Sequence, residues 1–338
     1  MNSRKIKIGL VGVANHGNTI LHAIQAAGNL QLVSCYDTNL VASQHVEKEF
    51  GVRVASSFDS LVADPQLDAV ALVTPNHLHA EQAKNAAATG KHIFVEKPIS
   101  NSISEAKEMI ATLRKAGLVL MVGHNTRRRR VFRRAKEMLQ EGKIGAIVAV
   151  EGNLSRPAGL QPDLPPWKGD PIKCALLPMT QLGIHLIDTA AYLLGPLKRV
   201  SCMAANIAMP GAVYDATAAI LQFDSGVLFA LTSYYVSPDA YFLRIYGTRG
   251  VLHCCPTNLR LELTDHEGPK DVIEEDFHQE GAESYELQMR EFGDCIINKR
   301  EPETNGEVGL QALAVIEAMA QSVAHSAIVN IRDILDMV

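Results

Sequence analysis

Short, continuously apolar runs alternate with helical stretches over the first 125 residues, and this alternation constrains the fold more than any other feature. The runs are "KIGLVGV", "LQLVSCYD", "DAVALVTP", "KHIFVEKP" and "LVLMVGHN". Strands that are apolar on both faces are expected where helices cover both sides of a sheet. We therefore predict a doubly wound α/β domain over residues 1–124, with six parallel strands, five of which these runs supply.

The rest of the chain has a different period. Alternating apolar and polar residues occur in "AIVAVEGNLSR", "ATAAILQFD", "GVLFALTSYY" and "FLRIYGTRG". This two-residue period predicts a large, mostly antiparallel, open sheet with one exposed face. We expect an α+β domain over residues 125–338, whose exposed face forms a homodimer or homotetramer.

The net charge of −5 argues against a nucleic-acid binder, because such proteins usually carry a basic stripe. The one local exception is the run Arg127–Arg130, followed by Arg133 and Arg134. Three interpretations stay open for it: a solvated helix face or subunit contact, a site for an anionic substrate or cofactor phosphate, and a nucleic-acid contact.

The six cysteines include no C-x-x-C pair, so the sequence predicts neither a metal site nor a disulfide framework. No segment reaches the roughly 18 uninterrupted apolar residues of a membrane span, and the N-terminus lacks an apolar stretch of signal length. We expect a cytoplasmic protein without a membrane partner.

The first turn, "GLVGVANHGNT", is typical of a dinucleotide site. Gly12, Ala14 and Gly17 have the spacing of G-x-G-x-x-G, with alanine in place of the middle glycine. Such a turn lets the backbone and a helix N-terminus approach a diphosphate, and a Rossmann fold follows. Asn15 and His16 lie in the same turn and are included among the candidate cofactor-binding residues. A purely structural turn is the alternative.

Asp37 ends the second strand, 20 residues beyond Gly17. A carboxylate there accepts hydrogen bonds from the adenosine ribose and repels a 2′-phosphate, so NAD is favoured over NADP. Alternatively, Asp37 only caps a turn with Thr38 and Asn39.

Polar residues follow two later strands, at an edge expected to line the same crevice. They are Thr74, Asn76 and His79 after one strand, and Glu96 and Lys97 after the next. A partly desolvated lysine has a lowered pKa and can donate a proton or bind a hydroxyl. A surface lysine at a strand end is the alternative interpretation.

Three stretches, "VTPNHLHAEQAKNAAATGKHIFVEKPIS", "LMVGHNTRRR" and "QLGIHLID", resemble the Gfo/Idh/MocA family of sugar and inositol oxidoreductases. The resemblance covers essentially the whole chain. It implies that Lys97 lies beside the nicotinamide and the substrate hydroxyl, and that the Lys97-Pro98 bond is cis. It also implies that His185 takes the proton as hydride leaves the carbon. The expected catalytic residues are thus Lys97 and His185.

The chain departs from that family at two places. Many relatives have an aspartate four residues before the histidine, where this chain has Gln181. Relatives commonly have paired glycines where this chain has Leu176 and Leu177. Trp167, in the preceding loop, is a candidate for stacking on a sugar ring, with simple packing as the alternative. The expected substrate-binding residues are Lys97, Asn125, Trp167, Gln181, His185 and Asp188.

Together these features predict an NAD-dependent oxidoreductase that acts on a secondary alcohol of a sugar, cyclitol or related polyol. Two alternatives remain: a catalytically silent dinucleotide- or sugar-sensing protein, and an NAD-using lyase or glycosidase with transient oxidation.

Overall fold

The computed structural model of this protein describes residues 4–265, 267–280 and 282–337. It divides into two compact units, one of Met1–Asn125 with Ala282–Leu310 and one of Thr126–Gly281 with Gln311–Val338. The predicted second domain, 125–338, differs from the structure because residues 282–310 group with the first unit. Each unit is described by itself.

The first unit contains a sheet in the order β3-β2-β1-β4-β5-β6, and every pairing in it is parallel. This order reverses direction between β1 and β4, as in dinucleotide-binding folds. The strands are β1 (Ile6–Val11), β2 (Leu30–Tyr36), β3 (Arg53–Val54), β4 (Ala69–Leu72), β5 (His92–Val95) and β6 (Leu120–Val122). The predicted six-stranded parallel sheet is confirmed.

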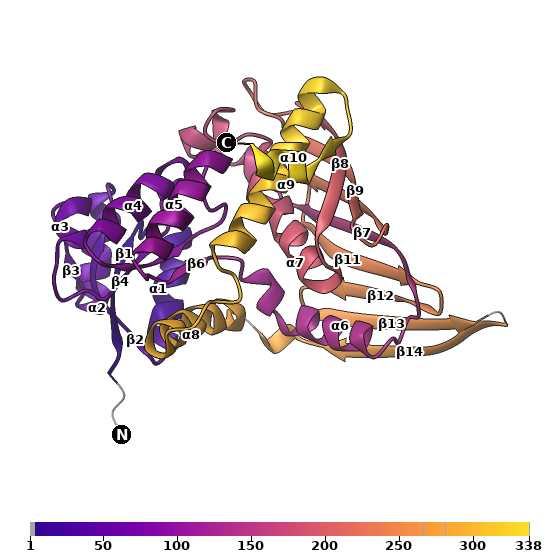
Figure 1. Ribbon diagram of the computed structural model, residues 1–338, viewed down its shortest axis with the longest axis horizontal. Coiled ribbons are helices and arrows are strands. Elements are labelled where there is room, and N and C mark those ends of the chain that lie inside the picture. The colour runs from indigo at the N-terminus through magenta and orange to yellow at the C-terminus, as the bar shows by residue number, and fades with distance from the viewer. Residues whose placement is uncertain (1–3, 266, 281, 338) are drawn as a thin grey trace. The chain divides into compact units, whose positions relative to one another are not determined.

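Helices cover both faces of this sheet (Figure 1). On one face, α1 packs against α8, and α8 also contacts β1 and β2. On the other face, a Cβ added at Gly9 would lie 2.8 Å from Leu61 of α3. The helices are α1 (His16–Ala26), α2 (Leu40–Phe50), α3 (Phe58–Val62), α4 (His79–Ala88), α5 (Ile103–Lys115) and α8 (Glu283–Asn298), followed by the start of α9 (Gly306–His325).

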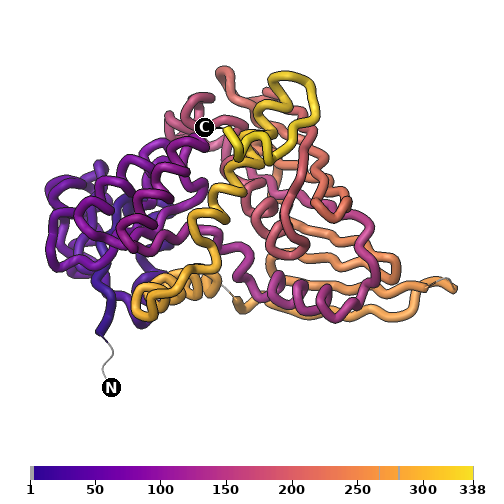
Figure 2. Tube along the Cα trace, viewed as in Figure 1, coloured from indigo at the N-terminus to yellow at the C-terminus, as the bar shows by residue number. Residues whose placement is uncertain are grey.

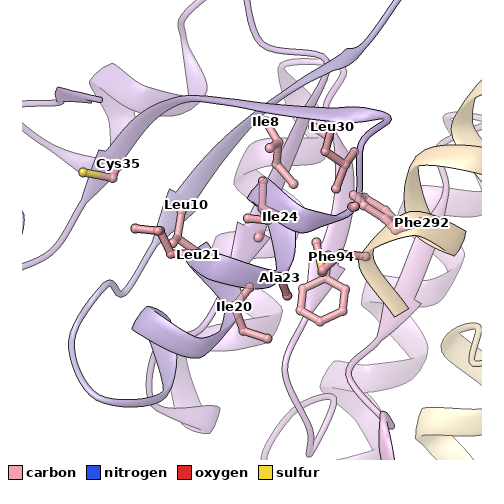
Figure 3. Packing of buried hydrophobic residues seen from close by; sticks show 14 of the residues in the cluster. Ile8, Leu10, Ile20, Leu21, Ala23, Ile24, Leu30, Cys35, Phe94 and Phe292 are labelled. Carbon is pink, nitrogen blue, oxygen red and sulfur yellow. The ribbon is translucent and has the colours of Figure 1, made fainter. Parts of the chain in front are cut away.

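The position of α8 in the first unit follows from the residues it buries. Met289 and Phe292 of α8 belong to the same core cluster as Ile24 of α1. Figure 3 shows Phe292 beside Phe94 of β5, and their ring centroids are 6.1 Å apart. Because these side chains are fully buried, α8 is part of the first unit's core although it lies late in the sequence.

The second unit contains a sheet in the order β14-β13-β12-β11-β7-β10-β9-β8-β15. Only β7 and β10 are parallel; the other pairings are antiparallel, as the two-residue period predicts. Strands β13 and β14 run on beyond their neighbours (Figure 2). The strands are β7 (Ile147–Ser155), β8 (Leu197–Ala205), β9 (Ala216–Phe223), β10 (Leu228–Tyr234), β11 (Ala240–Gly247), β12 (Gly250–Cys255), β13 (Asn258–Asp265), β14 (Gly268–Asp276) and β15 (Val329–Asn330).

Helices α6 (Arg130–Gln140), α7 (Ile184–Leu194) and α10 (Ile331–Asp336) pack on this second sheet. The covered face buries alternate residues such as Leu221, Phe229 and Leu231. A Cβ added at Gly152 of β7 would lie 3.2 Å from Leu186 of α7, which fixes the face that α7 covers. Ile220 and Leu228, which directly precede two of these residues, are exposed.

Within the described residues, no helix combines the length and the apolar character that crossing a membrane requires.

Candidate functional site

The turn between β1 and α1 has the backbone that a diphosphate site needs. Gly12 has φ +84°, and a Cβ there would lie 2.6 Å from the Val73 carbonyl oxygen. A Cβ on Gly17 would lie 2.0 Å from the Gly12 carbonyl oxygen, so both positions require glycine. Asn15, at φ +49°, precedes α1 and makes no side-chain cap. The first N–H groups of α1 therefore have no side-chain acceptor from Asn15, which fits binding of a dinucleotide diphosphate.

Asp37 holds this turn in place. Its Oδ2 accepts hydrogen bonds from the backbone N–H groups of Val13 (2.7 Å) and Ala14 (3.1 Å). Its Oδ1 accepts one from the N–H of Asn39 at 2.8 Å, so the turn-capping role is present. The contact with an adenosine ribose stays a prediction, and it would have to coexist with these three bonds.

The predicted residues after β4 contact the chain after β5. The imidazole nitrogens of His79 lie 2.9 Å from the carbonyl oxygen of Pro98 and 2.8 Å from that of Thr74. His79 is 1% exposed, and burial lowers its pKa although both carbonyls oppose that shift. Its ring thus joins two strand ends. Asn76 donates to the side-chain oxygen of Asn101, and the Thr74 hydroxyl donates to Gln82 at 2.6 Å.

Glu96 is a buried carboxylate between the glycine turn and Lys97. Its Oε1 lies 3.2 Å from His16 Nε2, and its Oε2 accepts from the Lys97 N–H at 3.2 Å. A Cβ on Gly123 would lie 2.7 Å from the same carboxylate, so the end of β6 leaves room for it. Burial raises the pKa of Glu96, but His16 and Lys97 outweigh burial and hold it below its usual value. The carboxylate therefore stays charged at neutral pH.

Lys97 is partly exposed at the end of β5, and the Lys97-Pro98 bond is cis, as the family resemblance implies. Asn125 lies at the end of the first unit's N-terminal segment and is 2% exposed. Its amide donates to the hydroxyl of Ser284 in α8 at 3.0 Å. Asn125 thus has a partner inside the fold, and its predicted contact with substrate is untested.

In the second unit, His185 lies in the first turn of α7 and is partly exposed. Its Nδ1 is 3.1 Å from the hydroxyl oxygen of Thr126. Its backbone carbonyl accepts a hydrogen bond from the Thr189 hydroxyl at 2.7 Å, which links the first turn of α7 to the second. A π-helical turn, Met179–Gly183, precedes α7, and such turns are frequent at functional sites. Thr126 thus contacts one ring nitrogen of His185, and the role of His185 in proton transfer stays a prediction.

Asp188 is bound by Arg127. The guanidinium donates to both carboxylate oxygens, with 2.9 Å to Oδ2 and 2.6 Å to Oδ1. The two side chains are 8% and 1% exposed, and Arg127 also lies over the ring of Tyr192. Such a buried bidentate pair fixes Thr126 and the start of α7 relative to each other. The carboxylate of Asp188, which we predicted to contact substrate, is therefore already hydrogen-bonded to Arg127.

Several members of the arginine run make contacts within the second unit. Arg127 and Arg128 are buried, which corrects the interpretation of a solvated face for these two. Arg133 donates to the Tyr192 hydroxyl at 2.7 Å, and Arg134 pairs with Glu275 at 2.8 Å.

The segment before α7 holds the departures from the family pattern. The amide of Gln181 donates to Cys174 Sγ at 3.5 Å. Leu176 has φ +46°, a backbone conformation that favours glycine, and its side chain is buried. Leu177 and Trp167 pack in one apolar cluster with Cys174.

Sequence reasoning missed Thr126 and Arg127 as partners of His185 and Asp188. Their spacing gave no signal, because the partners lie about 60 residues apart and meet only through the fold. Among the residues that the structure describes, no group of three or more His, Cys, Asp or Glu could hold a metal ion.

Comparisons with known proteins agree with this geometry. Residues 6–124 match the model described as "Oxidoreductase family, NAD-binding Rossmann fold", and residues 132–253 match the GFO/IDH/MocA C-terminal domain. The chain is 27% identical to 1,5-anhydro-D-fructose reductase of Ensifer adhaerens, covering 94% of this chain and 96% of that protein. It is 27% identical to inositol 2-dehydrogenase of Rhizobium meliloti, covering 96% and 99%.

Among solved structures, a putative NADPH-dependent oxidoreductase from Desulfitobacterium hafniense superposes with a TM-score of 0.92 at 26% identity. That match covers 98% of this chain and 99% of the other. The two family models together span most of the chain. The protein therefore belongs to the Gfo/Idh/MocA family of oxidoreductases, with an NAD-binding Rossmann domain.

Proposed function

We propose that this protein is an NAD-dependent dehydrogenase of a secondary alcohol in a sugar, cyclitol or related polyol. Relatives of nearly the same length are named 1,5-anhydro-D-fructose reductase and inositol 2-dehydrogenase, and both names imply hydride transfer at a carbohydrate carbon. Bound NAD would supply the acceptor for that hydride.

The observation that carries the proposal is the contact chain His16–Glu96–Lys97 in the first unit. Glu96 contacts His16 of the glycine turn with one oxygen and the N–H of Lys97 with the other. The lysine is therefore held at the same sheet edge as the turn that fits a diphosphate. Its ammonium would bind the substrate oxygen and stabilise the negative charge that develops there.

We assign proton transfer to Nε2 of His185. Thr126 contacts Nδ1 of that ring, which fixes the ring's orientation. In alcohol oxidation the neutral imidazole would accept the hydroxyl proton. Four further residues are candidates for shaping or supporting the substrate site without taking part in the reaction: Asn125, Trp167, Gln181 and Asp188.

The preference for NAD rests on Asp37, whose charge would repel the 2′-phosphate of NADP. Thr38, the next residue, supplies no positive charge to balance it. The name of the Desulfitobacterium hafniense structure includes NADPH, so both cofactors belong in the assay.

The decisive experiment is a panel of polyols and sugars read at the NADH absorbance band. Lys97→Ala should lower kcat by roughly two to four orders of magnitude, the scale of a positioned acid or base, and change the Kd for NAD much less. Lys84→Ala, which removes a partly exposed ion pair with Glu108, is the matched control and should keep full turnover.

Other outcomes point elsewhere. Product formed without net NADH would indicate a lyase or glycosidase that recycles the cofactor. Binding of NAD without turnover of any compound would favour a sensor. Equal losses of NAD affinity and turnover in Lys97→Ala would make Lys97 a nucleotide ligand.

We also propose that the protein forms a homodimer or homotetramer through the uncovered face of the second unit's sheet. Exposed apolar residues on three adjacent strands of this face support it: Met203, Ile220 and Leu228. Ile220→Asp with Leu228→Asp should convert the assembly to monomers in light scattering. A monomeric wild type at micromolar concentration would contradict the proposal.

A cytoplasmic location is proposed as well. None of the six cysteines forms a disulfide in the structure, as is usual in a reducing compartment. Fluorescence of a tagged protein in whole cells would test it.

A further inference from the structure

A lysine and a tyrosine of the second unit form a contact that the proposed reaction does not use. Lys168 Nζ donates to the Tyr235 hydroxyl at 3.3 Å and lies 5.5 Å from the centre of the Trp167 ring. Tyr235 is 2% exposed and packs in the same apolar cluster as Cys174. We call Lys168 and Tyr235, with Trp167 and Cys174, the lysine–tyrosine cluster.

Among the described residues, the ammonium in this cluster has no carboxylate as a counter-ion. Within the described ranges, no carboxylate lies within 4.0 Å of Lys168 Nζ. Asp170, two residues on, accepts from the N–H of Ile172 and pairs with Lys173 instead. Burial lowers the pKa of Lys168; the nearby Cys174 partly opposes this shift, and no carboxylate contributes to it. Holding an ammonium partly out of water without an anion is costly unless a ligand supplies the anion.

The hydroxyl of Tyr235 is the second hydrogen-bond donor of this cluster. Its oxygen accepts the bond from Lys168, while its own O–H hydrogen has no acceptor among the residues that the structure describes. Burial, with the nearby Cys174, raises the pKa of Tyr235 to about 12, so the hydroxyl keeps that hydrogen. Buried hydroxyl groups are rarely left without an acceptor. Two donors, one of them charged, therefore stand 3.3 Å apart.

The cluster adjoins the turn that carries His185. Cys174 Sγ accepts a hydrogen bond from Gln181, and Gln181 lies in the π-helical turn that ends at Gly183, directly before α7. His185 is the second residue of α7. A ligand that contacts Lys168 and Tyr235 would thus touch a cluster that is hydrogen-bonded to the turn before the proposed proton acceptor.

We propose that Lys168 and Tyr235 bind the carboxylate of an acidic sugar, such as a uronate or an aldonate, and that this enzyme oxidises such a sugar. The inference rests on the proposed dehydrogenase function and names its substrate class. A carboxylate offers two acceptor oxygens and one negative charge, which match one ammonium and one hydroxyl. A phosphate dianion carries more charge than this donor set balances. Lys168 is a specificity-determining residue here, not a catalytic one.

The test uses matched sets of substrates with the full-length protein and NAD. Each set holds a neutral hexose, its uronate, its aldonate and its 6-phosphate, for example in the glucose and galactose series. Turnover is read as NADH absorbance, and binding to the NADH-loaded protein is read by calorimetry.

In at least one series, the wild type should favour the carboxylate over the neutral sugar by about tenfold or more in kcat/KM or in Kd, the scale of a charge-assisted hydrogen bond. Lys168→Met should reduce that acid-to-neutral ratio by about 10- to 100-fold, and Tyr235→Phe by a smaller factor. Lys173→Met, which removes a surface ion pair with Asp170, is the matched control and should keep the wild-type ratio.

Three outcomes would overturn the inference: no gain from a carboxylate in any set, a preference for the 6-phosphate, or a ratio that Lys168→Met leaves unchanged. In each case, NADH formed from neutral sugars would leave the proposed dehydrogenase intact. Carboxylate binding that depends on Lys168, without NADH from any compound, would instead count against the dehydrogenase.

Discussion

Nδ1 of His185 lies 3.1 Å from the hydroxyl oxygen of Thr126, and the residue after Thr126 binds Asp188 on the same helix. Two consecutive residues of one short turn therefore hold α7 at two positions. The Arg127–Asp188 pair sets where the helix lies, and Thr126 sets how the imidazole is turned. The contact lies within the second unit, and the proposed proton transfer uses the other ring nitrogen, Nε2.

This contact predicts a kinetic effect of Thr126. Thr126→Val keeps the shape but removes the hydroxyl, so the imidazole loses its partner at Nδ1. We expect kcat to fall by about three- to tenfold, the value of one neutral hydrogen bond, with little change in KM. Thr126→Ser restores the hydroxyl and should recover most of the turnover. If Thr126→Val and Thr126→Ser lose activity equally, the methyl group matters and the hydrogen bond does not.

A second prediction concerns cofactor choice at Asp37. Asp37→Asn keeps an acceptor oxygen for the N–H groups of Val13 and Ala14 but removes the charge, so it should raise the NADP-to-NAD ratio of kcat/KM by about tenfold. Asp37→Ser with Thr38→Arg should raise it further, because arginine supplies a phosphate partner.

The serine variant should also melt at a lower temperature than the asparagine variant, because its shorter side chain cannot reach the turn. Measuring both variants separates the effect of charge from loosening of the turn. A wild type that already favours NADP would show that the assignment of Asp37 is wrong.

A third prediction uses the pH dependence of Glu96. The pKa of Glu96 in the folded protein lies below its usual value of 4.5, because His16 and Lys97 outweigh burial. A carboxyl group whose pKa is lowered by folding stabilises the protein above the unfolded pKa and loses that contribution as pH falls through the folded pKa. Glu96→Gln mimics the protonated form. Its loss of melting temperature should be full at pH 7 and shrink steadily below about pH 4.5.

Surface pairs give the control for this measurement. Glu108→Gln removes the exposed pair with Lys84 and should change the melting temperature little at any pH. A deficit of Glu96→Gln that stays constant down to pH 3 would mean that packing against Gly123, not charge, explains the loss.

Much of the first unit could be predicted from the sequence because its signals are local. Continuous apolar strands and the spacing of Gly12 and Gly17 each depend on neighbours in the chain. The sequence does not locate the strand Arg53–Val54, because two residues are too few to show a periodic pattern of apolar residues. The sequence also does not predict that α8 belongs to the first unit. An apolar helix face around Phe292 shows that the helix is buried, but not against which core.

The site was predictable only where a motif names the residue. Glu96, Lys97 and His185 lie in such motifs, and the cis bond before Pro98 follows the same resemblance. The residues that contact them could not be predicted in this way, because a contact such as that of Thr126 with His185 depends on how segments distant in the sequence meet in the fold. A solvated helix face is one of the three interpretations that the sequence leaves open for Arg127, whereas the fold buries this residue and pairs it with Asp188.

Leu176 combines a left-handed backbone with a buried side chain, and the two features have opposite effects on stability. Its φ of +46° costs an L-residue about 1–2 kcal/mol relative to glycine. Its side chain is 4% exposed, and removing a buried leucine side chain costs about 2–5 kcal/mol. Both Leu176→Ala and Leu176→Gly should therefore destabilise the protein.

The order of the two variants is the informative result. In an ordinary helix, alanine is more stable than glycine by about 1 kcal/mol, as Ala111→Gly on the exposed side of α5 should show. At position 176 the order should invert, because glycine alone relieves the backbone strain. Urea denaturation should thus give Leu176→Gly a free energy of unfolding at least equal to that of Leu176→Ala. A normal order, with alanine clearly more stable, would mean that the segment relaxes to negative φ once the leucine side chain is gone.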